Sequence, residues 1–175
     1  MNNALLDAAT KGDLSRVVAA LGTGQPVDTI DQQGRTPLMR AARGGHDHIV
    51  RALLDAGADI DHEATYYGWT ALAFAAQSGH AETVRILVEH RADLNAKGHR
   101  GKTPLMLAAD RGHAAVLIAL LEAGADPDPE ADHHGWVPLR QAVRNGHVEV
   151  VRVLLAAGAN RSHGTTATKP RYTSP

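Results

Sequence analysis

Four histidines that recur at a fixed interval are the first residues of this chain to suggest chemistry. They are His46, His80, His113 and His147, separated by 34, 33 and 34 residues. Imidazoles bind metal ions and transfer protons. Side chains that recur at such an interval lie one structural layer apart in a repeat protein, which is too far to share one ion. We therefore predict a structural role, in which each imidazole bonds to a loop of its own unit or of the next.

Two segments near residue 130 have partial features of metal sites. Asp132-His133-His134, with Glu130, gathers ligand types but lacks the second anchoring cluster that a zinc site needs. The stretch 126–132 has the alternating carboxylates that open a calcium-binding loop. However, Ala131 stands where that loop requires glycine, and Val137 where it requires glutamate. A solvated loop is favoured, and we expect no metal and no cofactor.

The arrangements that support catalysis are missing from the sequence. None of its four serines lies in a nucleophile-elbow motif, and there is no Walker-type phosphate loop. The absence of cysteine removes disulfides, zinc–thiolate sites and thiol catalysis together. We therefore predict that the protein is not an enzyme.

The composition of the chain limits its possible domain number, partners and location. The 175 residues suggest one domain with a continuous core, and a formal net charge of −1 gives no general attraction to nucleic acid or membranes. No apolar run approaches the roughly 20 residues needed to span a bilayer. The N-terminus lacks a basic region followed by a long apolar one, so we expect no signal peptide, a cytoplasmic location and a monomer.

The histidines belong to a longer pattern that begins at Gly34, Gly68, Gly101 and Gly135. In its clearest copies a threonine can cap a helix whose first residue is proline, as in Thr36-Pro37 and Thr103-Pro104. Small alanines then allow close packing, a glycine ends this helix, and a second apolar helix runs from about residue 46 to 56. A period of this length predicts a solenoid.

The motif Thr-Pro-Leu-x-x-Ala-Ala-x-x-Gly-His, followed by two leucines and Gly-Ala-Asp, resembles the ankyrin repeat. The resemblance implies an all-α solenoid of five helix–turn–helix units with projecting β-hairpin loops. It implies a single domain over 1–161. Its repeats would be approximately 1–33, 34–67, 68–100, 101–134 and 135–161. Residues 162–175 are then a disordered tail, or a segment that folds over the last helix pair.

Three departures from the repeat have structural consequences. Val137 replaces the capping threonine of the last unit, and the histidine usual after Thr-Pro-Leu is absent. Arg91 stands where the other units have the glycine that follows the second helix. We predict a left-handed backbone there, at a cost of about 1–2 kcal/mol. The connections 57–68 and 124–135 are each one residue longer than the others, which predicts two enlarged hairpin tips two repeats apart.

The resemblance also implies a binding surface, because ankyrin repeats generally hold partners on their concave side with hairpin tips and first helices. The positions that match are Arg35, Arg43, Tyr66, Tyr67, Trp69, Gln77, His99, Arg100, Lys102, Arg111, His133, His134, Trp136 and Arg144. This inner surface is expected to carry seven cations, counting Lys11, against one acid, Asp110. Exposed Trp, Tyr and Arg are enriched at interface hot spots.

Two interpretations of these residues stay open. Each tryptophan either contacts a partner or lies flat along the adjacent hairpin and stabilises it. The basic row either binds or is only a solvated face.

The sequence predicts a non-catalytic protein-interaction module whose partner is an unknown protein with an acidic patch. The alternative is a nucleic-acid binder that uses the same groove, with phosphates on Arg and Lys and bases stacked on Tyr or Trp. The near-zero net charge argues against nucleic acid.

Overall fold

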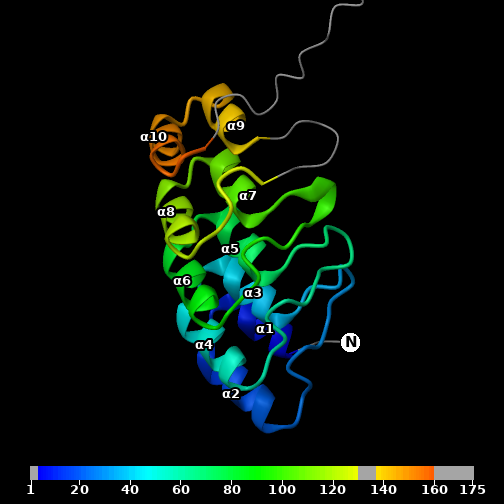
Figure 1. Cartoon of the computed structure of the whole chain (residues 1–175). Helices are drawn as coiled ribbons and strands as arrows, with labels where there is room; N and C mark the ends of the chain where they lie inside the picture. The colour runs from blue at the N-terminus through cyan, green and yellow to red at the C-terminus, as the bar shows by residue number, and fades with distance from the viewer. Residues whose placement is uncertain (1–3, 130–136, 160–175) are drawn as a thin grey trace, which may run out of the picture.

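A computed structural model describes residues 4–129 and 137–159 as a stack of helix pairs (Figure 1). The inner helices are α1 (Ala4–Lys11), α3 (Pro37–Gly44), α5 (Ala71–Ser78), α7 (Pro104–Arg111) and α9 (Pro138–Arg144). The outer helices are α2 (Leu14–Gly22), α4 (Asp47–Asp55), α6 (Ala81–Glu89), α8 (Ala114–Glu122) and α10 (Val148–Ala156). One 3-10 turn, η1 (His99–Gly101), lies in a loop. The expected all-α repeat solenoid is confirmed.

The helices form two parallel rows. Each inner helix contacts the inner helices before and after it, and the outer helices do the same. In Figure 1 the inner row lies between the outer row and the loops, which all project to one side. The inner helices and the loops therefore share one surface, on which most of the predicted binding residues lie.

Capping threonines start the inner helices as expected. Thr36 and Thr103 have extended backbones, and their hydroxyls accept hydrogen bonds from the N–H groups of Met39 and Met106. Thr70 caps α5 in the same way. Val137 makes no such bond at the start of α9.

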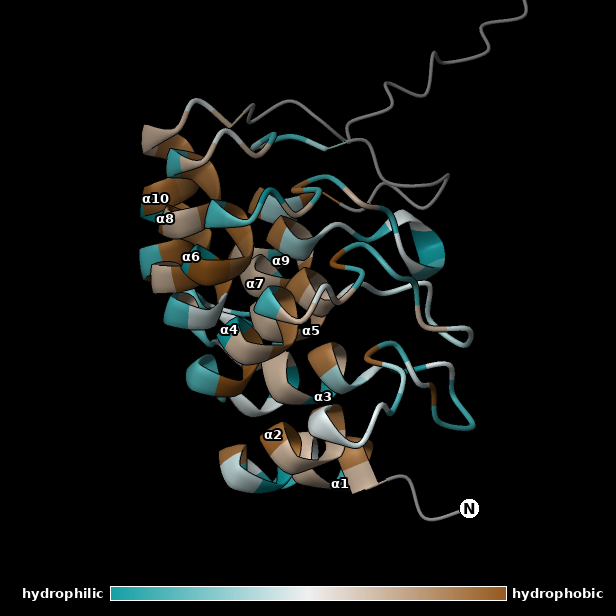
Figure 2. Ribbon diagram, turned by 90° about the horizontal axis from the view of Figure 1, so that it is seen from below, coloured by the Kyte–Doolittle hydropathy of each residue, from teal (hydrophilic) through white to brown (hydrophobic). Residues whose placement is uncertain are grey.

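Small residues fill the space between the inner helices. The paired alanines of this row, such as Ala41, Ala42, Ala108 and Ala109, are fully buried. Apolar residues concentrate on the helices, whereas the projecting loops are mostly hydrophilic (Figure 2). An alanine-rich core lets helices approach closely, so few aromatic residues are needed to complete it.

Each described loop is a tight turn rather than a two-stranded ribbon. One N–H···O=C bond closes each base: Asp31 to Arg35 at 3.1 Å, Ala64 to Trp69 at 3.0 Å and Gly98 to Lys102 at 3.1 Å. No strand occurs in residues 4–129 and 137–159, so the β-hairpins take this reduced form. The extra residue of the longer connection lies inside the Ala64–Trp69 tip. The second enlarged tip falls largely outside the described residues.

The acidic segments that follow the outer helices are connected by hydrogen bonds. Asp28 accepts a bond from the Asp59 N–H at 3.0 Å, and Asp61 accepts one from Asp93 at 2.9 Å. The carboxylate that was compared with a calcium ligand, Asp126, accepts the N–H of Asp128 at 2.9 Å. The first two bonds join consecutive loops, and the third closes a turn within one loop.

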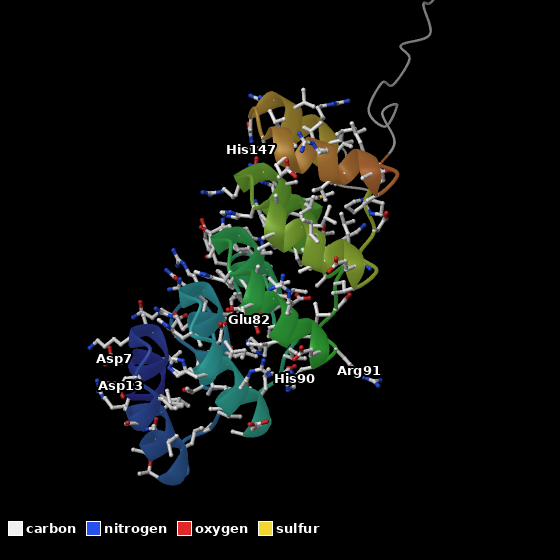
Figure 3. The ribbon with its side chains drawn as sticks, turned by 90° about the vertical axis from the view of Figure 1, so that its left-hand side faces the viewer. Asp7, Asp13, Glu82, His90, Arg91 and His147 are labelled. Carbon is white, nitrogen blue, oxygen red and sulfur yellow. The ribbon has the colours of Figure 1, made fainter. Side chains whose placement is uncertain are left out.

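The recurring histidines join consecutive repeats. The Nε2 atoms of His80, His113 and His147 lie 3.0 Å from the carbonyl oxygens of Arg43, Gln77 and Asp110, each in the preceding repeat. His46 bonds to Thr10 at 3.2 Å. The predicted structural role is therefore confirmed, but the direction was wrong, because each ring contacts the preceding unit. Figure 3 labels His147 at the start of α10.

Each imidazole occupies the space that is left by a glycine without a side chain. The left-handed glycine that ends an inner helix lies under the histidine of the next repeat, as Gly79 does under His113. A Cβ at Gly79 would lie 2.7 Å from Cε1 of that ring. Gly12, Gly45 and Gly112 have the same relation to the next histidine. We call this arrangement the glycine–histidine contact.

Arg91 adopts the left-handed backbone that the sequence predicted, with φ of 66°. The N–H of Arg91 bonds to the Val88 carbonyl at 2.9 Å and that of Ala92 to Leu87 at 3.0 Å, which is the usual closure of a helix end. Its side chain is exposed and projects from the end of α6 (Figure 3). The hydrogen bonds that close the end of α6 therefore hold Arg91 in its strained left-handed backbone.

We expect Gly79→Ala to lower the free energy of unfolding by about 2–3 kcal/mol, because the left-handed backbone costs about 1 and displacement of His113 costs more. Gly57→Ala is a matched control, since Gly57 has the same φ of 85° but nothing within 4 Å of the added methyl group. It should lose only about 1 kcal/mol. Urea denaturation measures both. Equal losses would show that the glycine–histidine contact contributes nothing.

Arg91→Gly should raise the free energy of unfolding by about 0.5–1 kcal/mol, because relief of left-handed strain exceeds the added entropy of the unfolded chain. Arg85→Gly, in the middle of α6, should instead lower it by about 1 kcal/mol. Thermal denaturation of both variants tests the assignment. A less stable Arg91→Gly variant would contradict it.

Candidate functional site

Six of the predicted binding residues meet at one hollow of about 600 Å³ on the inner surface. We call it the aromatic hollow. Its lining consists of Gln33, Arg35, Arg43, Tyr66, Tyr67, Trp69, Phe74 and Gln77. These residues come from two consecutive loops and from helices α3 and α5. Residues that are up to 44 positions apart in the sequence are thus brought together by the stacking of two repeats.

A chain of aromatic contacts runs from the core to the rim of this hollow. Phe74 meets Trp69 edge to face with ring centroids 5.4 Å apart, and Tyr67 stacks on Trp69 at 5.0 Å. Tyr66 contacts Tyr67 edge to face at 4.7 Å. The exposed fraction of the residue rises along this series of rings, from 9% for Trp69 to 42% for Tyr67 and 72% for Tyr66. Tyr66 is therefore the most available aromatic contact for a partner.

Trp69 supports the loop rather than projecting from it. Its indole lies so close to Gly98 of the next loop that any side chain there would overlap the ring. The Tyr67 carbonyl also accepts the N–H of His99 at 2.6 Å. Of the two interpretations of this tryptophan, the packing one describes it, although its edge lines the hollow. Tyr67 likewise shares this packing surface, which the sequence did not suggest.

Asp31 binds two arginines at the edge of the hollow. Its carboxylate accepts a hydrogen bond from Arg35 Nε at 2.9 Å and another from Arg40. Burial by itself raises the pKa of Asp31. Hydrogen bonds from the Arg35 and Gln33 backbone and from both guanidinium groups outweigh burial and lower this pKa to about 2. Arg35 is therefore held in place by its own chain, and the cluster of one carboxylate and two guanidinium groups keeps a net charge of +1.

Arg43 is the charge of the hollow that stays available. It is exposed at the end of α3 and has no ion pair with the described residues. Gln33 and Gln77 add amide groups that donate and accept hydrogen bonds. The hollow thus combines one unpaired cation, two amides and an aromatic wall.

The other predicted residues lie further along the inner surface. His99, Arg100, Arg111 and Arg144 are exposed, and Lys102 is half-buried. Burial lowers the pKa of Lys102, Asp110 raises it, and the positive charges of Arg100 and Arg111 lower it again, so these groups share one field. None of the five lines the aromatic hollow.

The prediction that only one acid, Asp110, offsets the cations of the inner surface was wrong. Asp7 pairs with Lys11 at 3.1 Å and with Arg16 at 3.2 Å, and Asp31 pairs with Arg35. Acids on α1 and the first loop therefore neutralise part of the row that was assigned the single acid Asp110. The positive character is local, around Arg43 and around Arg100 and Arg111.

A second hollow of about 570 Å³ lies one repeat earlier. We call it the N-terminal hollow. Its lining consists of Leu6, Asp7, Thr10, Thr29, Ile30, Asp31, Gln32 and Arg40. Ile30 is 53% exposed at its rim. Asp31 and Arg40 line this hollow while their partner Arg35 lines the aromatic one, so the Asp31 cluster separates the two.

Some predictions fall outside the described residues. These are the predicted contacts His133, His134 and Trp136, the metal candidates Glu130 and Asp132, and the tail 162–175. Across 4–129 and 137–159, no three His, Asp or Glu side chains gather as metal ligands. Over the same ranges, no helix is both long enough and apolar enough to cross a membrane.

Sequence reasoning missed Phe74 and Asp31. Phe74 occupies the position of Arg40 and Leu107 in the neighbouring units, which stands one turn into the inner helix. Phe74 would have been identified if this helix position had been assigned to the side that faces the loops. Asp31 lies just before the tip, four residues ahead of Arg35, and this spacing was the available signal.

Comparison with known proteins agrees with this architecture. Residues 5–98 and 96–163 match a family model described as "Ankyrin repeats (3 copies)". Over 56 residues the chain is 39% identical to protein YahD of Escherichia coli (strain K12), whose name describes it as an ankyrin repeat protein. It is 45% identical over 56 residues to the ankyrin repeat, SAM and basic leucine zipper domain-containing protein 1 of Colobus guereza.

These similarities are partial. Each covers 32% of this chain, and the aligned part is 28% of the bacterial protein and 12% of the primate one. The chain therefore spans under a third of either relative.

Asp31→Asn should lower the free energy of unfolding at pH 7 by about 2 kcal/mol, because the ionised carboxylate bonds both arginines. The folded pKa of about 2 lies below the ordinary 3.8, so this stabilisation is present above pH 4 and is lost as pH falls towards 2. The difference between wild type and variant in urea denaturation should shrink over that range. A matched control is Asp55→Asn, at an exposed position of α4, where we expect no such difference. A pH-independent loss for Asp31→Asn would contradict the assignment.

Proposed function

Because this chain belongs to the ankyrin-repeat family, whose members generally mediate protein–protein interaction as non-enzymatic modules, we propose that it binds a partner protein through its inner surface. The aromatic hollow is the proposed centre of contact, and the cations around Arg100, Lys102 and Arg111 extend it. Arg144 lies further along the same row. The partner presents an acidic patch with an apolar anchor.

The observation that carries this proposal is the convergence on one hollow of six residues that the sequence placed at hairpin tips and on first helices. Tyr66 is 72% exposed and rests on a supported aromatic chain. An ordered aromatic side chain loses little entropy on binding, which is one reason why tyrosine is common at hot spots. Arg43, which has no ion pair within residues 4–129 and 137–159, adds a positive charge to the same hollow.

Nucleic acid is the alternative occupant of the same surface. Phosphate binding needs several uncompensated cations in a row. Here Asp7 and Asp31 pair with Lys11, Arg35 and Arg40 along the first part of the row. This pairing favours a protein partner that makes a few specific contacts.

The test is a pull-down from a lysate of the source cells with the Arg43→Glu, Tyr66→Ala double variant. Trp69 is left intact because it supports the loop. We expect the retained partner to fall at least about tenfold, since both changes remove central contacts. Arg85→Glu with Ile118→Ala is the matched control on the outer helices, where both residues are exposed. It should retain the partner.

Nuclease treatment and a salt series distinguish the alternatives. A protein partner resists nuclease and shows a mild salt dependence, whereas phosphate contacts give a steep fall of affinity with salt. Loss of the bound material on nuclease treatment would replace the proposal by the nucleic-acid alternative. Retention by the double variant would move the site away from the hollow.

A further inference from the structure

The two hollows are equivalent places in consecutive repeats. The aromatic hollow receives Arg43, Phe74 and Gln77 from helices α3 and α5, and the N-terminal hollow receives Asp7, Thr10 and Arg40 from α1 and α3. Both are bounded by the loops that project beside these helices. Packed helices lie about 8–10 Å apart, so the hollows are separated by about that distance along the inner surface.

Their chemistry differs. The aromatic hollow has exposed tyrosine rings and an arginine with no ion pair among the described residues. The N-terminal hollow has an exposed isoleucine, Ile30, while its acids, Asp7 and Asp31, are already paired with cations of the same chain. The first hollow therefore favours an aromatic group with a neighbouring negative charge, and the second favours an uncharged aliphatic group.

From this pair of hollows we infer that the partner contributes an extended peptide segment with two anchors. An aromatic side chain with an adjacent Asp or Glu enters the aromatic hollow, where the carboxylate meets Arg43. An aliphatic side chain about three residues away reaches Ile30, because an extended chain advances about 3.3 Å per residue. This inference rests on the proposed function and specifies the acidic patch as one carboxylate at a defined spacing.

The Asp31 cluster sets the register of such a segment. It stands between the hollows and holds Arg35 and Arg40 in place with its own carboxylate. Its single carboxylate is bonded to two guanidinium groups, so the cluster keeps a net charge of +1 and disfavours a basic side chain of the partner. The residues between the two anchors therefore pass over it and can be polar or acidic.

The test is selection of a randomised 12-residue peptide library on the full chain, followed by fluorescence polarisation with the labelled consensus peptide. We expect enrichment of an aromatic residue beside Asp or Glu, with an aliphatic residue about three positions away. Arg43→Glu should weaken the consensus peptide at least about tenfold. It should not weaken a version of the peptide with Asn or Gln in place of the acid.

Ile30→Asp tests the second anchor. It should weaken the consensus peptide several-fold and leave unchanged a peptide with alanine at the aliphatic position. Arg85→Glu, at an exposed position of the outer helix α6, is the control that should bind the consensus peptide with an affinity within about twofold of wild type.

Absence of any enriched peptide overturns the inference, and so does a consensus peptide insensitive to both Arg43→Glu and Ile30→Asp. These results can be separated from failure of the proposed function. If no peptide binds but the lysate partner still requires Arg43 and Tyr66, the function stands and the partner presents a folded surface instead. If the lysate material is lost with nuclease, the proposed function itself fails.

Discussion

The spacing of the repeats depends on the glycine–histidine contact. A residue with any side chain at Gly79 would occupy the volume that the His113 ring fills. The ring in turn bonds to a carbonyl of the unit before it, at the C-terminal end of an inner helix. The same two residues thus end one inner helix and position the start of the outer helix in the next pair. Repetition of this contact fixes the distance between inner helices, and with it the width of every hollow between them.

The width of the candidate site depends on the spacing of the inner helices, but its rigidity comes from other contacts. Phe74 anchors Trp69 in the core, and Trp69 lies against Gly98 of the following loop. On the other side, Asp31 holds Arg35 and Arg40 by charge-assisted hydrogen bonds, which are stronger than neutral ones. One wall is therefore fixed by aromatic packing and the other by ion pairs. Tyr66 and Arg43, which neither wall needs, remain available for binding.

The periodic features were predictable from sequence because each recurs and has a local cause. Threonine caps, the end-of-helix glycines and the left-handed Arg91 depend on the backbone of one unit, which the residue types specify. The pairing of Asp31 with Arg40 and the burial of Trp69 depend on which side chains meet across units. A single unit contains no information about its neighbour, so the direction of the histidine bonds was missed. The charge of the inner surface was overestimated because the local pairs Asp7–Lys11 and Asp31–Arg35, each four residues apart, were not counted.

The position of the aromatic hollow has a consequence for how the array opens. In a solenoid each unit is stabilised only by its neighbours, so the terminal units fray first. The hollow is built from the second and third helix pairs and their loops, and its Trp69 lies against the loop that precedes the fourth pair. Fraying of α9 and α10 leaves all of these elements in place. Occupancy of the hollow would consequently slow hydrogen exchange in the middle of the stack and leave the C-terminal pair as labile as before.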